Sequence, residues 1–196
     1  GITDESITFG QLRENCRTFA IQLQKIFKLN VGQTIAVFLP NCIEFAIIVL
    51  GACEAGIVVT TINNHHVEGE IAQQLIDSDA KLLFGSVSSQ KVLKKAVELT
   101  KRSIEIICVS QSEEELPSDG INFTELLEKF EDFPLDHERN CYKTALLLYS
   151  SGTTGISKGV MLSHMNVVSS SLMFNHPAVA FTLPAIGNHQ DVIQCV

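Results

Sequence analysis

The sequence predicts an α/β protein in which a parallel sheet is flanked by helices. Short apolar runs rich in β-branched residues alternate with amphipathic segments at steps of about 23 residues, which is the pattern of parallel α/β architecture. The strand-like runs are continuously apolar, as is typical of parallel strands buried on both faces. With 45% apolar and 18% charged residues, the 196-residue chain can build a buried core for one domain or for part of a larger one.

The first helix is expected to begin at Thr8 and to run for about twenty residues. Thr8 and Gln11 have the spacing of a capping box, and Ile7 and Leu12 are placed to form a hydrophobic staple around it. Apolar residues then recur at three- and four-residue steps, which gives the helix one apolar face: Leu12, Cys16, Phe19, Leu23, Ile26 and Phe27.

The alternation of strand and helix continues as far as residue 109. Gly56 is expected to close the second helix, because glycine readily adopts the left-handed conformation that follows a helix. The expected elements are a strand over 34–39 ended by Pro40, a helix over 41–55, a strand over 57–61, a helix over 67–78, a strand over 81–84, a helix over 88–100 and a strand over 104–109.

The pattern is less regular in the second half of the sequence. Residues 111–120 form an acidic, proline-containing segment that predicts a solvated surface loop. Asn122 and Glu125 predict a second capping box, at the start of a short helix to Phe130 and before a polar connector over 131–140. The remaining expected elements are strands over 144–149 and 160–162, a helix from Ser163 or His164 to Phe174, and a strand over 191–196.

Composition excludes several classes of function. The net charge of −8 disfavours nucleic acid as a partner, since binding to a phosphate backbone needs a basic surface. The longest apolar stretch, residues 42–62, is interrupted by glycines and glutamates, so it predicts no transmembrane segment. The six cysteines include no C-x-x-C pair and most lie within apolar runs, which predicts free thiols in a reducing, intracellular compartment.

Residues 149–159 (YSSGTTGISKG) are the segment most informative about function. They combine Ser and Thr hydroxyls, three glycines and one lysine directly after an expected buried strand. Glycine lets backbone N–H groups approach an anion, hydroxyls donate neutral hydrogen bonds, and lysine supplies a positive charge, so this composition predicts a polyphosphate-binding loop. A flexible Ser/Gly linker has a similar composition, but the apolar runs that flank the segment on both sides favour the loop.

Two other motifs compete for the same residues. A Walker A loop requires Lys followed by Ser or Thr, whereas Lys158 precedes Gly159, so that motif is absent. Residues 155–159 match G-x-S-x-G, the nucleophile elbow of serine hydrolases, which would make Ser157 the nucleophile. The expected strand ends several residues before Ser157 and strand character resumes at Val160, which disfavours an elbow, because an elbow places Ser between a strand and a helix.

Two histidines and a late apolar segment are the remaining candidates. The adjacent His65 and His66 have no acid or cysteine at ligand spacing, so they predict a polar loop after a strand rather than a metal site. The apolar residues within 172–181 fit either the lining of a substrate pocket or ordinary core packing.

Residues 150–159, followed by 160–164 (VMLSH), resemble the phosphate loop of the adenylate-forming, or AMP-binding, enzymes. Four upstream segments are similar to the same family in the same order: 38–41 (FLPN), 44–45 (EF), 50–56 (LGACEAG) and 80–82 (AKL). The resemblance is closest to the branch of acyl-CoA synthetases, 4-coumarate–CoA ligases and firefly-type luciferases, and it covers essentially the whole chain. It implies that residues 1–196 are an incomplete part of the family's large N-terminal AMP-binding domain, truncated at both ends and without the C-terminal lid domain.

The resemblance also implies a reaction and a set of binding residues. The family activates a carboxylic acid with ATP: the carboxylate attacks the α-phosphorus, pyrophosphate leaves, and the thiol of coenzyme A captures the acyl-adenylate. The positions that match the nucleotide-binding loop are Ser150, Ser151, Gly152, Thr153, Thr154, Gly155, Lys158 and Gly159. Thr153 also matches a position that binds Mg²⁺. Ser157 stands where most relatives have Pro, which predicts a looser loop, because proline restricts φ.

The implied partners are therefore ATP, Mg²⁺, coenzyme A and a small-molecule carboxylic acid, in an enzyme of the cytoplasm or the peroxisome. The family's adenine-binding segment, Mg²⁺-binding glutamate, ribose-binding aspartate and catalytic lysine fall after Val196, so the 196-residue chain alone is expected to be inactive. The alternative is a non-catalytic nucleotide-binding or interaction module left by truncation.

Overall fold

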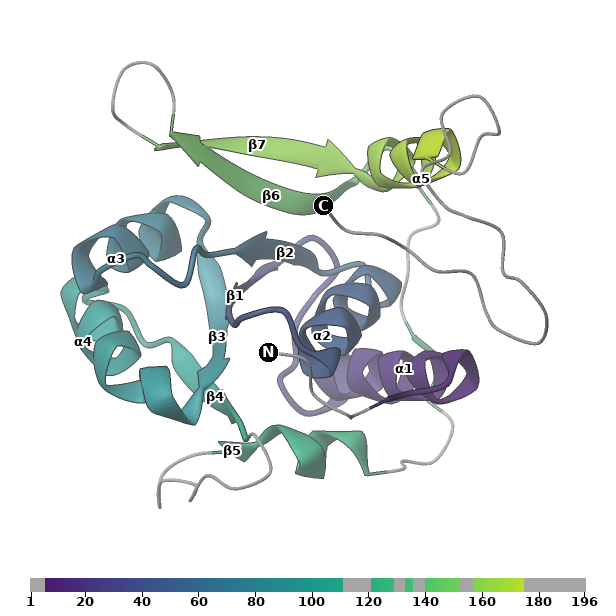
Figure 1. Ribbon diagram of the computed structural model, residues 1–196, viewed down its shortest axis with the longest axis horizontal. Coiled ribbons are helices and arrows are strands. Elements are labelled where there is room, and N and C mark those ends of the chain that lie inside the picture. The colour runs from purple at the N-terminus through teal and green to yellow at the C-terminus, as the bar shows by residue number, and fades with distance from the viewer. Residues whose placement is uncertain (1–5, 111–120, 129–132, 136–139, 152–156, 175–196) are drawn as a thin grey trace.

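The computed structural model describes residues 6–110, 121–128, 133–135, 140–151 and 157–174 (Figure 1). The helices in these ranges are α1 (Phe9–Lys25), α2 (Ile43–Glu54), α3 (Glu68–Asp77), α4 (Gln90–Thr100) and α5 (His164–Phe174), with 3₁₀ turns η1 (Val87–Ser89) and η2 (Phe123–Leu127). The strands are β1 (Thr34–Phe38), β2 (Val58–Thr61), β3 (Ala80–Ser86), β4 (Glu105–Val109), β5 (Ile121–Asn122), β6 (Thr144–Ser151) and β7 (Ser157–Ser163).

One sheet holds the described strands in the order β5-β4-β3-β1-β2-β6-β7. Helices α1 and α2 cover one face of this sheet, and α3 and α4 cover the other (Figure 1). Every neighbouring pair is parallel except β6 and β7, which pair antiparallel. The predicted α/β fold is confirmed, with the correction that the sheet is mixed rather than parallel throughout. The connection over 152–156 is too short for a parallel crossover, which needs a dozen residues or more.

The central strands bury both of their faces. In β1, Ile35 and Val37 join the apolar cluster on the α1–α2 face, while Ala36 and Phe38 join the cluster on the α3–α4 face. Successive side chains of a strand point to opposite faces, so a strand that is covered on both sides is apolar at every position rather than at alternate positions. This is why residues 35–38 form a continuous apolar run.

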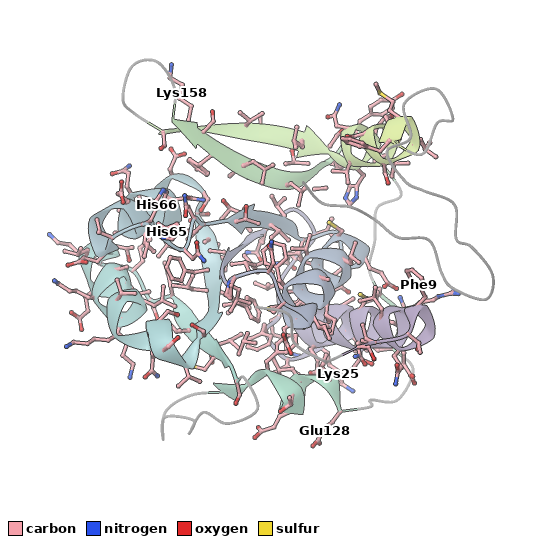
Figure 2. The ribbon with its side chains drawn as sticks, in the orientation of Figure 1. Phe9, Lys25, His65, His66, Glu128 and Lys158 are labelled. Carbon is pink, nitrogen blue, oxygen red and sulfur yellow. The ribbon has the colours of Figure 1, made fainter. Side chains whose placement is uncertain are left out.

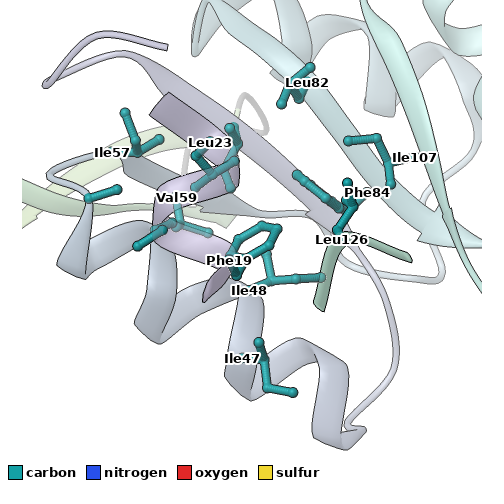
Figure 3. Packing of buried hydrophobic residues seen from close by; sticks show 14 of the residues in the cluster. Phe19, Leu23, Ile47, Ile48, Ile57, Val59, Leu82, Phe84, Ile107 and Leu126 are labelled. Carbon is teal, nitrogen blue, oxygen red and sulfur yellow. The ribbon is translucent and has the colours of Figure 1, made fainter. Parts of the chain in front are cut away.

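The cluster on the α1–α2 face is built around three phenylalanines (Figure 3). Phe19 of α1 is completely buried, and its ring centroid lies 5.5 Å from those of Phe84 in β3 and Phe123 in η2. Ile47 and Ile48 of α2 belong to the same cluster. These two ring contacts join α1 to the sheet and to η2.

Helix α1 begins as predicted and packs closely on α2. The Gln11 N–H donates to Thr8 Oγ1 at 3.2 Å and the Thr8 N–H donates to Gln11 Oε1 at 2.9 Å, which forms the predicted capping box. The helix ends at Lys25, after 17 residues rather than about twenty. Gly51 allows the close approach of α2, since a Cβ at that position would lie 2.7 Å from the carbonyl oxygen of Cys16.

Two helix predictions need correction. Helix α2 begins at Ile43, two residues later than expected, because Cys42 is extended at its N-cap. The helix expected from Asn122 is instead a strand residue followed by the 3₁₀ turn η2. In a 3₁₀ turn, residues three apart share a face, and this places Phe123 and Leu126 together in the core.

Other predictions hold or lie outside the described residues. Gly56 closes α2 with a φ of +70°, and α5 has the expected bounds. The acidic segment 111–120 and the strand expected over 191–196 lie outside the described residues, as does most of the connector over 131–140. Among the described helices, none has the length and apolar character that crossing a membrane requires.

Candidate functional site

The predicted phosphate loop belongs to the β6–β7 hairpin (Figure 1). Strand β6 ends at Ser151 and β7 begins at Ser157, and residues 152–156 between them lie outside the described residues. Strand β6 also pairs in parallel with β2, which joins the hairpin to the central sheet. The carboxyl end of β6 therefore lies at the sheet edge where the parallel strands end, which is the usual edge for ligand sites in α/β proteins.

Strand pairing extends further into the predicted loop than the sequence indicated. Four of the predicted binding residues lie in the two strands: Ser150, Ser151, Lys158 and Gly159. The other four lie outside the described residues: Gly152, Thr153, Thr154 and Gly155. The hairpin itself was missed, although two strand-like runs separated by so short a connection were the signal that could have found it.

The side chains of Ser150 and Lys158 share one face of the hairpin. These residues are directly opposite each other, and opposite residues of an antiparallel pair point to the same face. Both are exposed. Leu146 points the same way as Ser150 and packs against the α1–α2 cluster, which makes this the α2 side of the hairpin.

Lys158 has no anionic partner in the part of the chain that the structure describes. The ion pairs of those residues lie elsewhere, on α1–α2, on α3–α4 and around Asp79. Figure 2 shows Lys158 at the loop end of the hairpin, pointing away from α3. An exposed ammonium group with a hydroxyl opposite it is suited to bind an anion.

A cavity of about 470 Å³ opens at the carboxyl ends of β1, β2 and β6. Its lining includes Pro40 after β1, Phe45 of α2, Asn63 after β2 and Leu148 of β6. Leu148 lies on the same face of β6 as Ser150, so the cavity adjoins the face that carries Lys158. The lining of the cavity is mostly polar and includes several asparagines, whose amides can orient a small molecule by hydrogen bonds.

The opposite face of the hairpin contacts α3. The Tyr149 hydroxyl donates a hydrogen bond to the carboxylate of Asp77, the last residue of α3. Burial of the phenol, followed by its interaction with Asp77, raises the pKa of Tyr149, so the hydroxyl keeps its proton at neutral pH. Both residues line a cavity of about 580 Å³ together with His66, Glu70 and Ser157.

A buried polar network holds β6 against β2 and α3. Thr60 Oγ1 donates to the carbonyl oxygen of Leu147 at 2.8 Å, and Gln74 Nε2 donates to Thr60 Oγ1 at 2.9 Å and to the carbonyl oxygen of Thr61 at 3.0 Å. Thr60 is 0% exposed and Gln74 is 4% exposed. Because leaving such groups unpaired costs about 1–3 kcal/mol, the network fixes where β6 enters the sheet. No local sequence pattern predicts this network, because it joins residues from three separate elements.

The competing motifs are not supported by the geometry. Ser157 is the first residue of a strand, whereas an elbow nucleophile lies between a strand and a helix. His65 is exposed and His66 is half-buried in the connection after β2. Among the described residues, no three His, Cys, Asp or Glu side chains gather to hold a metal ion. The Mg²⁺ position predicted at Thr153 lies outside those residues.

Comparison with known proteins assigns the chain to a family. A model of the family described as AMP-binding enzyme matches residues 2–196. The chain belongs to the AMP-binding enzymes. The family predicted from the sequence is thus confirmed, while the roles assigned to individual residues of the loop stay predictions.

Relatives and solved structures agree with this assignment. A 4-coumarate–CoA ligase from Pinus taeda is 33% identical over 200 residues, which cover 100% of this chain and 35% of the relative. A benzoate CoA ligase from Burkholderia xenovorans LB400 matches with a TM-score of 0.75 and 22% identity, over 90% of this chain and 33% of that one. The luciferase-like enzyme from the nonluminescent Zophobas morio mealworm matches with a TM-score of 0.75 and 23% identity, over 86% of this chain and 40% of that one. These two structures support the α/β fold. The chain spans about a third of the length of the AMP-binding relatives.

Proposed function

We propose that this chain provides the nucleotide-phosphate site of an acid–CoA ligase. The observation that carries the proposal is the Ser150–Lys158 pair, which is exposed on one face of the hairpin. The residues that connect the two strands, 152–156, have the sequence GTTGI. The pair lies at the carboxyl edge of the sheet and beside a cavity. A hydroxyl and an ammonium group at this position both donate hydrogen bonds to phosphate oxygens.

Each residue type in the loop has a physical role in this proposal. Lys158 balances phosphate charge, and the Ser and Thr hydroxyls donate neutral hydrogen bonds. Gly152 and Gly155 let backbone N–H groups approach the anion. The full set is Ser150, Ser151, Gly152, Thr153, Thr154, Gly155, Lys158 and Gly159. We assign a Mg²⁺ contact to Thr153, and a bound Mg²⁺ would neutralise charge on the phosphates.

The proposed reaction begins with attack of a substrate carboxylate oxygen on the α-phosphorus of ATP. Pyrophosphate leaves and an acyl-adenylate forms; the thiol of coenzyme A then attacks the acyl carbon and AMP leaves. Two anions must meet and a polyanion must depart, so fixed donors along the phosphates lower the barrier. Support comes from the family and from the names of relatives, which include 4-coumarate–CoA ligase and long-chain-fatty-acid–CoA ligase.

The names of the same relatives support a proposal for the substrate class and bear on the compartment. We propose a small-molecule carboxylic acid as the substrate and coenzyme A as the acceptor. The cytoplasm and the peroxisome stay the two predicted compartments, and one relative is named peroxisomal OPC-8:0-CoA ligase 1, from Arabidopsis thaliana. The alternative function is a nucleotide-binding or interaction module that keeps the hairpin but performs no chemistry.

ATP–pyrophosphate exchange tests the proposal. We would measure it with aromatic and long-chain carboxylic acids, on the 196-residue chain and on the longest protein that its gene encodes. Exchange by the longer protein supports an acid–CoA ligase. ATP binding without exchange by either protein favours the non-catalytic module.

Lys158 is the residue whose replacement tests the site directly. In the longer protein, Lys158→Ala is expected to slow exchange by about 10- to 1,000-fold, the effect of losing one positioned donor at a developing charge. Lys91→Ala is the matched control, because Lys91 is an exposed lysine on α4. Wild-type exchange by the Lys158→Ala protein would contradict the assignment.

A further inference from the structure

The loop end of the β6–β7 hairpin projects beyond the rest of the sheet. The parallel ladder between β2 and β6 ends at the pair Thr61–Leu148. The hairpin ladder continues for three more pairs, to Ser151 and Ser157. At about 3.3 Å per residue, Ser151 lies roughly 10 Å past the last backbone pairing with β2. The residues proposed to bind phosphate therefore lie on an extension that has few backbone contacts with the body of the sheet.

A side-chain hydrogen bond reaches from this extension to a helix. Tyr149 is the first residue past the end of the β2–β6 ladder, and its hydroxyl donates to the carboxylate of Asp77 at the end of α3. Among the described residues of the extension, 149–151 and 157–159, no other hydrogen bond or ion pair is made with a different element. A hydrogen bond to a carboxylate is about twice as strong as one between neutral groups.

Gly159 provides the space that the tyrosine occupies. It pairs directly with Tyr149, and a Cβ at Gly159 would lie 3.1 Å from Cζ and 3.2 Å from Oη of the phenol. A larger residue would press on the ring at the atoms that reach Asp77. The sequence predicts a role for Gly159 in phosphate binding alone, and the structure adds this second reason for a glycine.

We propose that the Tyr149–Asp77 hydrogen bond fixes the loop end of the hairpin, so that Tyr149 is a positioning residue for nucleotide phosphates. This inference rests on the proposed function of the loop. Tyr149 points to the α3 side, away from the face shared by Ser150 and Lys158, so it acts through the backbone of the hairpin and not by touching phosphate. Fixing the hairpin before ATP binds lowers the ordering cost of binding.

The test uses Tyr149→Phe, Asp77→Asn and the double variant in the longest protein that the gene encodes. Tyr142→Phe is the matched control, because Tyr142 is 76% exposed and lies outside the hairpin strands. Amide hydrogen exchange without nucleotide reports the order of the hairpin, and titration with Mg²⁺–ATP reports affinity. The thermal midpoint of each variant shows whether the whole fold is affected.

We expect Tyr149→Phe to raise the rate of amide hydrogen exchange at residues 150–151 and 157–159 by about 5- to 20-fold and to weaken ATP binding by a similar factor. The thermal midpoint should match that of Tyr142→Phe. The double variant should have the same hydrogen-exchange rates and ATP affinity as Tyr149→Phe alone, because the two side chains act through one hydrogen bond.

Two results would overturn the inference. In one, the Tyr149→Phe and Tyr142→Phe proteins have the same rates of amide hydrogen exchange in the hairpin and the same affinity for ATP. In the other, Tyr149→Phe has faster amide hydrogen exchange throughout the sheet and a lower thermal midpoint, which would show a general structural role. The first of these results, together with strong ATP binding by the wild type, removes only the positioning role and leaves the proposed function intact. If the folded wild-type longer protein binds no Mg²⁺–ATP, the proposed function fails and the positioning role fails with it.

Discussion

Two regions of this molecule are stabilised in different ways. The body, which consists of β1–β4, α1–α4 and η2, buries apolar side chains on both faces of the sheet, with Phe19 and Phe84 completely inaccessible to solvent. Among the described residues of β6, β7 and α5, by contrast, Ala145 alone is buried. Met161 is 72% exposed and Leu172 is 67% exposed.

The difference separates what stabilises the fold from what places the site. Burial of apolar surface stabilises the body, whereas the hairpin depends on backbone pairing with β2, on the Thr60–Gln74 network and on the Tyr149–Asp77 contact. Substitutions in the body should therefore change global stability. Substitutions at the loop end of the hairpin should change local order and binding.

The largest expected contrast is in thiol reactivity. Burial raises the pKa of Cys16, Cys42 and Cys53 to about 11, so that about one in a thousand of each is ionised at pH 8. Cys141 is exposed at the start of the hairpin region. Iodoacetamide at pH 8 should modify Cys141 at least about 100-fold faster than it modifies the three buried cysteines, as measured by peptide mass spectrometry. The contrast should shrink as the pH approaches 11, and uniform labelling of the folded chain would contradict it.

The next largest effect is expected from the aromatic core. Phe19→Ala removes a completely buried ring that contacts Phe84 and Phe123, so it should lower the free energy of unfolding by about 3–5 kcal/mol. Urea denaturation followed by circular dichroism measures this. Phe9→Ala, at a phenylalanine that is 76% exposed, should change it by less than about 0.5 kcal/mol. Equal effects of the two substitutions would show that the described core is wrong.

Substitutions of two helical glycines in the body should change the free energy of unfolding in opposite directions. Gly51→Ala places a Cβ 2.7 Å from the Cys16 carbonyl oxygen, so it should destabilise the protein by about 1–3 kcal/mol through the α1–α2 contact. Gly69→Ala in α3 meets no atom within 4 Å and should stabilise it by up to about 1 kcal/mol. Denaturation midpoints compare the two, and a destabilising Gly69→Ala would argue against the bounds of α3.

The smallest effect on stability is expected on the exposed strand of the hairpin. Met161→Ser should change the free energy of unfolding by less than about 0.5 kcal/mol, because the side chain is largely exposed. Solubility should rise, since the substitution interrupts an exposed apolar surface. A loss of stability comparable to that of Phe19→Ala would show that β7 belongs to the core.

The sequence predicted the body better than the hairpin, for a physical reason. The capping box at Thr8, the closing glycine at position 56 and the apolar strand runs are local signals, and the structure confirms them. The Tyr149–Asp77 contact joins residues that are 72 positions apart in the chain, so no local pattern encodes it, whereas the hairpin left a local signal in the short connection between its two strands. The family was predicted from residues 150–159, because a run of hydroxyls, glycines and a lysine is specific without any tertiary information.

The most direct test of the central claim is a titration of the folded, longest protein that the gene encodes with Mg²⁺–ATP, followed by amide NMR. We expect the signals of residues 150–159 to shift and saturate, while those of Phe19 and Ile48 in the body stay in place. Lys158→Ala should weaken this response, and Lys91→Ala should leave it unchanged. Signals of 150–159 that do not move in a chain shown to be folded, or shifts confined to the body, would contradict the assignment of this hairpin as the nucleotide-phosphate site.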